Sequence, residues 1–405
     1  MKAGLARFLW LWLPPLAIFL AGLRRAFLTG QADPWDWGVP AALLLAGAGL
    51  LLARWGWTTL TWATLAWVAL GSAGMAMLFC AVAAARAPDP GAAIGLLLLA
   101  LLAAFGGARL RPPSVSGVLL LLLAALLLWR GPAHPIQPVP DRPGLAVITG
   151  LPLFWDEAGR AGRRDAPIIA VLRTRFTVMP MDDARALATA GMDRLLLAQP
   201  RALTPVQLVA IDQWVRRGGT ALVLADPLLR WPSDLPLGDR RRSPSISLLD
   251  PLLAHWGFHP DGAPKSMEIR HFLPDGDLLT LSGAQLHRGG LPAYRRIGRG
   301  KVLLLGDADP IDDRLWLADP AHPRDPRYWV ADTPACIMRW LGGVPVPGDR
   351  RWMLEADDVQ NGIRWALVAG TFWAVMGAIL LRRERRGSRP GTKGEGDGVK
   401  EGKSG

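Results

Sequence analysis

The sequence LLLAQPRALTPVQLVAIDQWVRRGGTALVLAD, residues 195–226, decides the fold of this chain. Its middle begins a helix with three agreeing signals: Thr204 as the N-cap, Pro205 at the first helical position, and Gln207 three residues after the cap. The cap hydroxyl, a proline that needs no N–H partner, and a glutamine that reaches back to the cap together favour a first helical turn.

This helix has one apolar face and a short strand on either side. The apolar face carries Leu208, Ile211, Trp214 and Val215. Gly218 and Gly219 end the helix, and the apolar runs 195–198 and 220–225 have the length of buried strands. Two strands joined by one helix through short loops predict a parallel βαβ unit with a right-handed crossover.

The residues around this unit extend it to a larger domain. We expect further strands at residues 145–149, 168–172, 176–179, 278–282, 293–297 and 301–306, and helices at 182–190, 247–257 and 332–341. Buried apolar strands that alternate with helices predict an α/β domain with a doubly wound, mostly parallel sheet.

The first 130 residues have the composition of membrane helices. Apolar segments run over residues 8–23, 39–53, 58–85, 91–108 and 115–129, and a sixth covers 363–381. A membrane-spanning helix needs about 20 mostly apolar residues, so the second and fifth are short, although Trp55, Trp57 and Trp129 extend them into the interface. A cleaved signal peptide is the alternative for the first segment; we favour an uncleaved helix.

The distribution of Lys and Arg predicts the orientation. Arg382, Arg383, Arg385 and Arg386 follow the last apolar segment, which places the C-terminus in the cytoplasm. Six membrane-spanning helices then place the N-terminus in the cytoplasm too, and residues 131–360 outside the cytoplasm. The membrane in this arrangement is the inner membrane of a bacterium. The expected organisation is a membrane bundle (1–130), a proline-rich linker (131–143), an extracytoplasmic α/β domain (144–349), a juxtamembrane segment (350–362), a transmembrane helix (363–381) and a basic disordered tail (382–405).

The net charge of +12 does not indicate nucleic-acid binding. Residues 131–360 hold 28 Lys and Arg against 27 Asp and Glu, so the excess lies on helix flanks and the tail, where anionic lipid explains it. The five N-terminal apolar segments contain no Asp, Glu, Lys, Arg or His, which argues against ion conduction by these helices alone.

The opening stretch and two later ones carry a family resemblance. The sequences LLLAQPRALTPVQLVAIDQWVRRGGTALVLADP, LLDPLLAHWGF and GRGKVLLLGDADPIDD resemble, in that order, the extracytoplasmic domain of gliding-motility-type auxiliary proteins of ABC transporters. The resemblance implies a sheet fold similar to class I glutamine amidotransferases, and a non-enzymatic subunit beside an ABC-2 type permease and a separate ATPase.

The sequence does not retain amidotransferase chemistry. That chemistry needs a thiol at a tight strand-to-helix turn, with a histidine and an acid nearby. The chain has two cysteines, Cys80 in an apolar segment and Cys336 in a late helix, and the expected turns hold Gln199 and Asp226 instead. We therefore predict no catalytic residue and no cofactor.

Four carboxylates follow the last strong strand and are the best metal candidate: Asp307, Asp309, Asp312 and Asp313. Hard cations take several oxygen ligands from a short loop, but this spacing does not match an EF-hand loop. Helix capping and solvation are the alternative, and we favour them.

The ends of the parallel strands predict where a ligand or partner would bind. Open α/β sheets bind ligands beyond the carboxyl ends of their strands. In this chain those ends are Thr149, Gly150, Gln199, Asp226 and Asp307.

Three functions follow from these observations. The first is a non-enzymatic accessory subunit of an ABC-type transport or export system with a partner- or substrate-binding domain outside the cytoplasm. The second is a membrane-anchored envelope hydrolase that uses residues 307–313, and the third is a structural or sensing module of envelope assembly.

Overall fold

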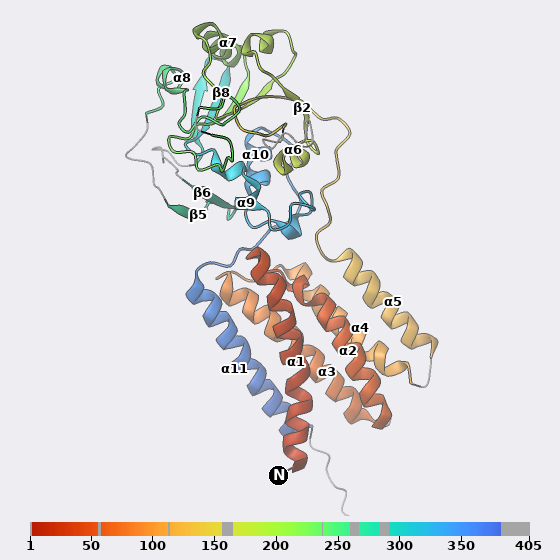
Figure 1. Ribbon diagram of the computed structural model, residues 1–405. Helices are drawn as coiled ribbons and strands as arrows, with labels where there is room; N and C mark the ends of the chain where they lie inside the picture. Colours follow the sequence, from red (N-terminus) through yellow and green to blue (C-terminus); the bar gives the residue numbers. More distant parts are fainter. Residues whose placement is uncertain are drawn as a thin grey trace, which may run out of the picture.

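The computed structural model describes residues 2–55, 58–111, 114–155, 165–236, 238–259, 267–282 and 291–381. It has two parts, a bundle of long helices and an α/β domain above one end of that bundle (Figure 1). The predicted cytoplasmic tail, residues 382–405, lies outside the described residues.

All six expected apolar helices form. They are α1 (Lys2–Thr29), α2 (Gly38–Leu52), α3 (Thr59–Ala83), α4 (Pro90–Arg109), α5 (Val115–Arg130) and α11 (Ala356–Leu380), with the 3₁₀ turns η1 (Pro34–Trp37) and η2 (Ala53–Trp55) between them. Five of these regions are long and apolar enough to cross a membrane, and α5 is shorter, with 16 residues. Helix α11 begins before residue 363 because Glu355 and Asp358 form a capping box.

Small residues bring the helices of the bundle close together. A Cβ added at Gly49 of α2 would lie 2.2 Å from the carbonyl oxygen of Ala104 on α4, and one at Gly71 of α3 would lie 2.7 Å from the Trp373 ring on α11. Trp373 in turn stacks on Trp67 with ring centroids 4.1 Å apart. The glycines at these positions therefore serve packing within the bundle.

The α/β domain contains a six-stranded sheet. Its strands are β1 (Gly144–Thr149), β2 (Thr177–Pro180), β3 (Arg194–Ala198), β4 (Thr220–Leu224), β7 (Ala293–Ile297) and β8 (Gly300–Leu305), in the order β2-β1-β3-β4-β8-β7. Every neighbouring pair is parallel except β7 with β8. The predicted mostly parallel sheet is confirmed, and residues 195–226 form the β3-α7-β4 unit at its centre.

Helices cover both faces of the sheet. One face packs against α7 (Pro205–Arg216), α8 (Asp250–His255) and the 3₁₀ turn η3 (Ala184–Ala188). The other packs against α6 (Pro167–Leu172), α9 (Asp313–Trp316), α10 (Thr333–Trp340), the 3₁₀ turns η4 (Asp309–Ile311) and η5 (Pro326–Tyr328), and a separate hairpin of β5 (Glu268–Phe272) and β6 (Leu278–Ser282). Buried strand residues alternate between the two cores, which explains why these strands read as continuous apolar runs.

Two local predictions were wrong. Residues 168–172, expected as a strand, form helix α6, because Pro167 occupies its first position and the apolar run packs on the core from one helical face. The helix expected at residues 182–190 shortens to the 3₁₀ turn η3, which Asp183 caps. Strand β5 was not expected; its residues alternate between exposed and half-buried, as is typical of a strand at the surface.

The proline-rich segment after α5 packs onto the α/β domain. The Ile136 side chain is buried, and the Ile136 N–H donates to the carbonyl oxygen of Arg324 at 2.6 Å. The Val139 N–H donates to the Thr174 carbonyl oxygen at 2.9 Å. This segment therefore fixes the domain to α5 through its backbone.

A second connection joins the domain to the loop after α1. Gln31 pairs in antiparallel fashion with Trp352, and the Ala32 N–H donates to the Arg351 carbonyl oxygen at 2.7 Å. The Gln31 side chain donates to the carbonyl oxygens of Pro326 and Trp329 at 2.9 and 2.8 Å. Loop, domain and the segment leading to α11 thus share one hydrogen-bonded junction.

Candidate functional site

The carboxyl ends of four adjacent parallel strands meet at one edge of the sheet. The residues there are Thr149 at the end of β1 and Gly150 after it, Gln199 after β3, Asp226 after β4 and Asp307 after β8. Hydrogen bonds run across these ends: the Gly150 N–H donates to the Gln199 carbonyl oxygen at 3.0 Å, and the Ala308 N–H donates to Asp226 Oδ2 at 3.1 Å. The structure brings the predicted ligand face together as one continuous edge.

Gln199 lies in the turn that follows β3. Its φ of +42° lies in the left-handed region, which costs a non-glycine residue on the order of 1 kcal/mol or more. Its side chain is fully buried; Nε2 donates to the carbonyl oxygens of Asp226 and Pro244 at 3.1 and 3.2 Å, and Oε1 accepts from the Asp226 N–H at 2.9 Å. A strained turn after a strand is where hydrolases present a nucleophile, but here an amide joins two strand ends.

Replacing Gln199 by Leu is expected to destabilise this edge by about 2–4 kcal/mol, because the Asp226 N–H and two carbonyl groups lose their buried partner. Hydrogen exchange on the full chain in detergent would show faster exchange at the amides that follow β3 and β4. Gln213→Leu is the matched control, since Gln213 is exposed on α7. Equal exchange in the two variants would contradict the role given to Gln199.

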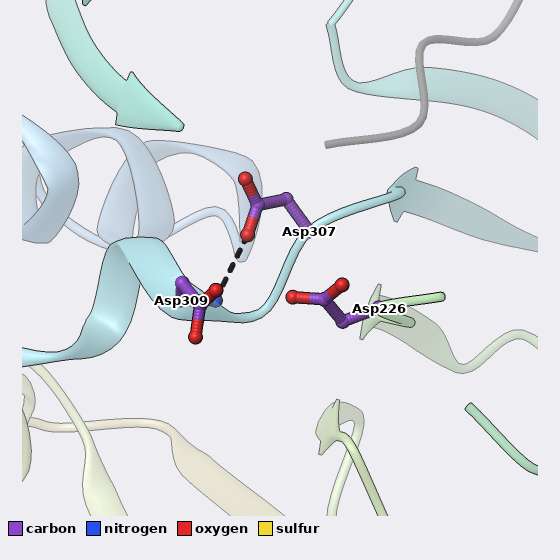
Figure 2. Close-up of side chains that lie close together, drawn as sticks. All are labelled: Asp226, Asp307 and Asp309. Atoms are coloured by element: carbon purple, nitrogen blue, oxygen red, sulfur yellow. Dashed lines mark hydrogen bonds between the residues drawn. The ribbon is translucent and has the colours of Figure 1, made fainter. Parts of the chain in front are cut away.

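Three buried carboxylates lie beside this turn. One carboxylate oxygen from each of Asp226, Asp307 and Asp309 lies within 4.8 Å of the other two, and all three residues are at most 2% exposed. Figure 2 shows Asp307 and Asp309 on the turn that follows β8, with the Asp226 carboxylate directed toward that turn.

Backbone N–H groups surround these carboxylates. Asp226 accepts from Leu228 and Ala308 at 2.7 and 3.1 Å. Asp307 accepts from Ser282 and Asp309 at 2.6 and 2.9 Å. Both oxygens of Asp309 accept from the Arg230 N–H, at 3.1 and 2.9 Å. The three side chains therefore hold together the ends of β4, β6 and β8 and the start of the 227–247 segment.

Burial makes the charged form of this cluster costly. Burial, together with the neighbouring Asp226 charge, raises the pKa of Asp307 to about 9. Burial also raises the pKa of Asp309 to about 7 and raises the pKa of Asp226 above its usual range. The backbone donors oppose this effect without cancelling it, so the cluster binds protons at neutral pH unless a cation takes their place.

The oxygen atoms of the three carboxylates suit a hard divalent cation as well as protons. Each of the six oxygens accepts from a backbone N–H and keeps a lone pair for one further partner. Three carboxylates within reach of one another are a ligand set typical of Ca²⁺ or Mg²⁺.

The structure divides the four carboxylates that the sequence grouped as a metal candidate. Asp307 and Asp309 join Asp226, whereas Asp312 caps α9 and forms an ion pair with Arg314 at 2.5 Å. Asp313 begins α9 and is partly buried, which raises its pKa. Asp226 belongs to the cluster because β4 and β8 are neighbours, and no spacing along the sequence indicates that neighbourhood.

A cavity of about 490 Å³ opens beside the end of β4. Its walls include the apolar side chains of Ile246, Leu253 and Phe258, with Asp250 and His259 as polar groups. An apolar cavity with a few polar groups beyond a strand end is a usual place for a ligand or a partner's side chain.

The thiol of the α/β domain lies elsewhere. Cys336 is fully buried in α10, and burial raises its pKa well above the usual range. A buried thiol with a raised pKa is a poor nucleophile.

Residues 142–262 match the family described as an ABC-type uncharacterized transport system. This region runs from the start of the sheet past α8 and includes β3, α7 and β4. The match supports an auxiliary protein of an ABC transport system. No curated protein matches the chain.

Solved structures of glycosidases show a weak similarity. Gan42B, a GH42 beta-galactosidase, and its catalytic mutant from G. stearothermophilus are each 13% identical, with TM-scores of 0.28 and 0.27, over 64% of this chain and 42% of theirs. The exo-beta-1,4-mannosidase Op5Man5 from Opitutaceae bacterium strain TAV5 is 9% identical, with a TM-score of 0.24, over 62% of this chain and 51% of its own. The chain spans about half the length of these enzymes or less, and similarity at this level assigns neither fold nor activity.

Proposed function

We propose that this chain is a non-enzymatic accessory subunit of an ABC-type transport system, and that its α/β domain binds a partner or substrate outside the cytoplasm. The family match over residues 142–262 carries this proposal. The apolar helices support membrane anchoring. The domain's fold class within this proposal is the class I glutamine-amidotransferase type, which the parallel order β2-β1-β3-β4-β8 supports.

The strand ends support recognition over catalysis. At the turn after β3, where a nucleophile would be presented, the side chain of Gln199 is buried and hydrogen-bonded. The thiol of Cys336 is buried in another part of the domain. The concave surface beside β4 is mostly apolar, which suits a peptide segment or an apolar ligand.

The orientation that we propose has both termini in the cytoplasm. Figure 1 places the start of α1 and the end of the described α11 at the end of the bundle far from the α/β domain. The Arg-rich sequence after α11 then faces the cytoplasm, and the α/β domain lies outside it. A reporter enzyme that is active only in the cytoplasm, fused at Gly387, is expected to be active.

Affinity purification of the full chain from gently solubilised membranes tests the function. We expect an ATPase and a multi-helix permease in stoichiometric amounts, identified by mass spectrometry. Ile246→Glu places a charge at the mouth of the cavity, on a side chain that is 54% exposed, and is expected to reduce this recovery about tenfold.

The matched control is Val209→Glu, on the outer face of α7, where the side chain is also 54% exposed. This variant is expected to recover both subunits as the unmodified chain does. Recovery of the chain without ATPase and permease would overturn the transport assignment. Equal losses in the two variants would overturn the cavity as the binding surface and leave the assignment standing.

A further inference from the structure

A cavity of about 250 Å³ opens at the junction between the bundle and the α/β domain, and charged side chains form part of its lining. At about 30 Å³ of liquid volume per water molecule, this is room for a group several times larger than one water. Its walls come from the loop after α1, the start of α4, the end of α5, the turn η5 and the segment 347–351.

In the orientation that we propose for the bundle, the cavity lies at the level where the membrane meets water. The end of α1, the start of α4 and the end of α5 all lie on the side of the bundle that faces the α/β domain (Figure 1). Trp129 at the end of α5 is 65% exposed beside Arg130, as is typical of an aromatic anchor among lipid headgroups. A group that enters this cavity from the bilayer would be a headgroup.

Equal numbers of opposite charges line the cavity. Three carboxylates and three guanidinium groups do so: Asp33, Asp89, Asp349, Arg327, Arg350 and Arg351. A simple anion would meet the carboxylates, and a simple cation would meet the arginines. A zwitterion with a phosphate at one end and an ammonium at the other can pair with both.

The arginines offer more donors than the protein satisfies. Arg350 forms an ion pair with the buried Asp332, yet its Nη1 has no acceptor in the described part of the chain. Arg351 Nε likewise has none among the described residues. Both side chains are nearly buried, at 10% and 12% exposed, so each unpaired N–H is costly.

The carboxylates on the other side have capacity to accept. Asp33 Oδ1 caps η1 by accepting from the Trp35 N–H at 3.0 Å. Asp89 Oδ2 caps α4 by accepting from the Ala92 N–H at 2.8 Å. A carboxylate accepts several hydrogen bonds, so both residues can also accept from a primary ammonium group.

We propose that this cavity binds the headgroup of a zwitterionic phospholipid of the phosphoethanolamine type. The phosphate pairs with Arg350 and Arg351, and the ammonium pairs with Asp33 and Asp89. The bound lipid would link the α1–α2 loop, the start of α4 and the α/β domain, and so fix the domain on the bundle. This inference does not depend on the proposed transport partners.

Native mass spectrometry of the full chain, with lipids of matched acyl chains added, tests the proposal. We expect phosphatidylethanolamine to be retained about tenfold better than phosphatidylglycerol or phosphatidylcholine, because only the first has both the phosphate and an N–H donor. Inorganic phosphate at millimolar concentration is expected not to displace it. Displacement by phosphate would instead assign a simple anion site.

Two variants separate the two ends of the headgroup. Asp89→Asn keeps a helix-capping side chain and removes the charge, so it is expected to lower phosphatidylethanolamine retention about tenfold without unfolding α4. Arg351→Gln is expected to lower retention of every phosphate-containing lipid. Arg324→Gln, at an exposed position, and Asp319→Asn, at a partly exposed position, both lie outside the cavity and are the matched controls.

Two results would overturn the proposal. One is equal retention of the three lipids by the unmodified chain. The other is a loss of retention in the control variants as large as the loss in Asp89→Asn.

Discussion

Raising the pH from 5 to 9 in cation-free buffer is expected to lower the unfolding temperature of the α/β domain by about 10 °C or more. The cause is the cluster of Asp226, Asp307 and Asp309. Burial raises the pKa of Asp309 to about 7 and that of Asp307 to about 9. In the unfolded chain these carboxyl groups ionise near pH 4.

The direction of this change in stability follows from the numbers of protons that the folded and unfolded states bind. Between pH 4 and the folded pKa values, the folded domain binds more protons than the unfolded chain, so its stability falls as pH rises. The fall is on the order of 1.4 kcal/mol per pH unit for each group that stays protonated. It ends near pH 7 for Asp309 and near pH 9 for Asp307.

Two variants test the cause. Asp309→Asn holds a neutral side chain at every pH, so it is expected to make the fall in stability between pH 5 and 7 shallower by about 1.4 kcal/mol per pH unit and to leave the part due to Asp307. Asp319→Asn removes a carboxylate whose pKa is lowered by hydrogen bonds on the surface, so it should leave that part of the curve unchanged. A flat profile in the unmodified chain would contradict the protonated cluster.

Adding divalent cations to the same unfolding experiment tests whether the three carboxylates form a cation site. If Ca²⁺ or Mg²⁺ binds the three carboxylates, millimolar cation should restore the unfolding temperature at pH 9 and have little effect at pH 5. The restoration should be absent in Asp309→Asn. This pattern would identify a cation site, and its absence would leave the cluster as a proton-binding tie between strand ends.

Replacing Asp332 by Ala is expected to destabilise the chain by about 3–5 kcal/mol. Asp332 is fully buried, forms an ion pair with Arg350, and accepts from the Leu278 N–H at 2.9 Å and from Trp352 Nε1 at 2.5 Å. Its loss leaves the Arg350 guanidinium, which is 10% exposed, without its carboxylate.

The site of proteolytic cleavage distinguishes a local effect of the Asp332 substitution from a general loss of stability. Asp332 connects β6 and α10 with the segment that leads to α11, so limited proteolysis should cut first near residues 345–355. Asp319→Ala, which removes an exposed pairing with His322, is the control and should change stability by less than about 1 kcal/mol. An effect of Asp332→Ala as small as the control's would refute the role of this ion pair.

The central unit of the sheet could be predicted because its signals are local. The cap at Thr204, Pro205 and the capping box with Gln207 are all present, and residues 194–198 pair in parallel with 220–224. Caps and apolar runs act within a few residues, so sequence order alone displays them. Residues 168–172 show the limit of this reasoning, since a short apolar run fits a strand or a buried helix equally well.

The candidate site is formed by contacts between residues that lie far apart in the sequence. The order of elements along the sequence identified the strand-end residues Gln199, Asp226 and Asp307. It did not show that Gln199 and Asp226 form two hydrogen bonds with each other. The grouping of Asp226 with Asp307 and Asp309 needs β8 to lie beside β4, although 80 residues, which include α8 and the β5–β6 hairpin, lie between Leu224 and Leu305. Spacing along the chain therefore suggested Asp312 and Asp313 instead.

The sequence by itself determined the membrane helices, the βαβ unit and the balance of charge outside the membrane segments. These follow from hydrophobic length, periodicity and capping, which are properties of neighbouring residues. Only the tertiary structure decided which carboxylates share a buried space, and that the α1–α2 loop joins the domain through Gln31. The physical reason is that burial and hydrogen-bond partners are set by strand order and docking, and these bring together residues that lie far apart in the chain.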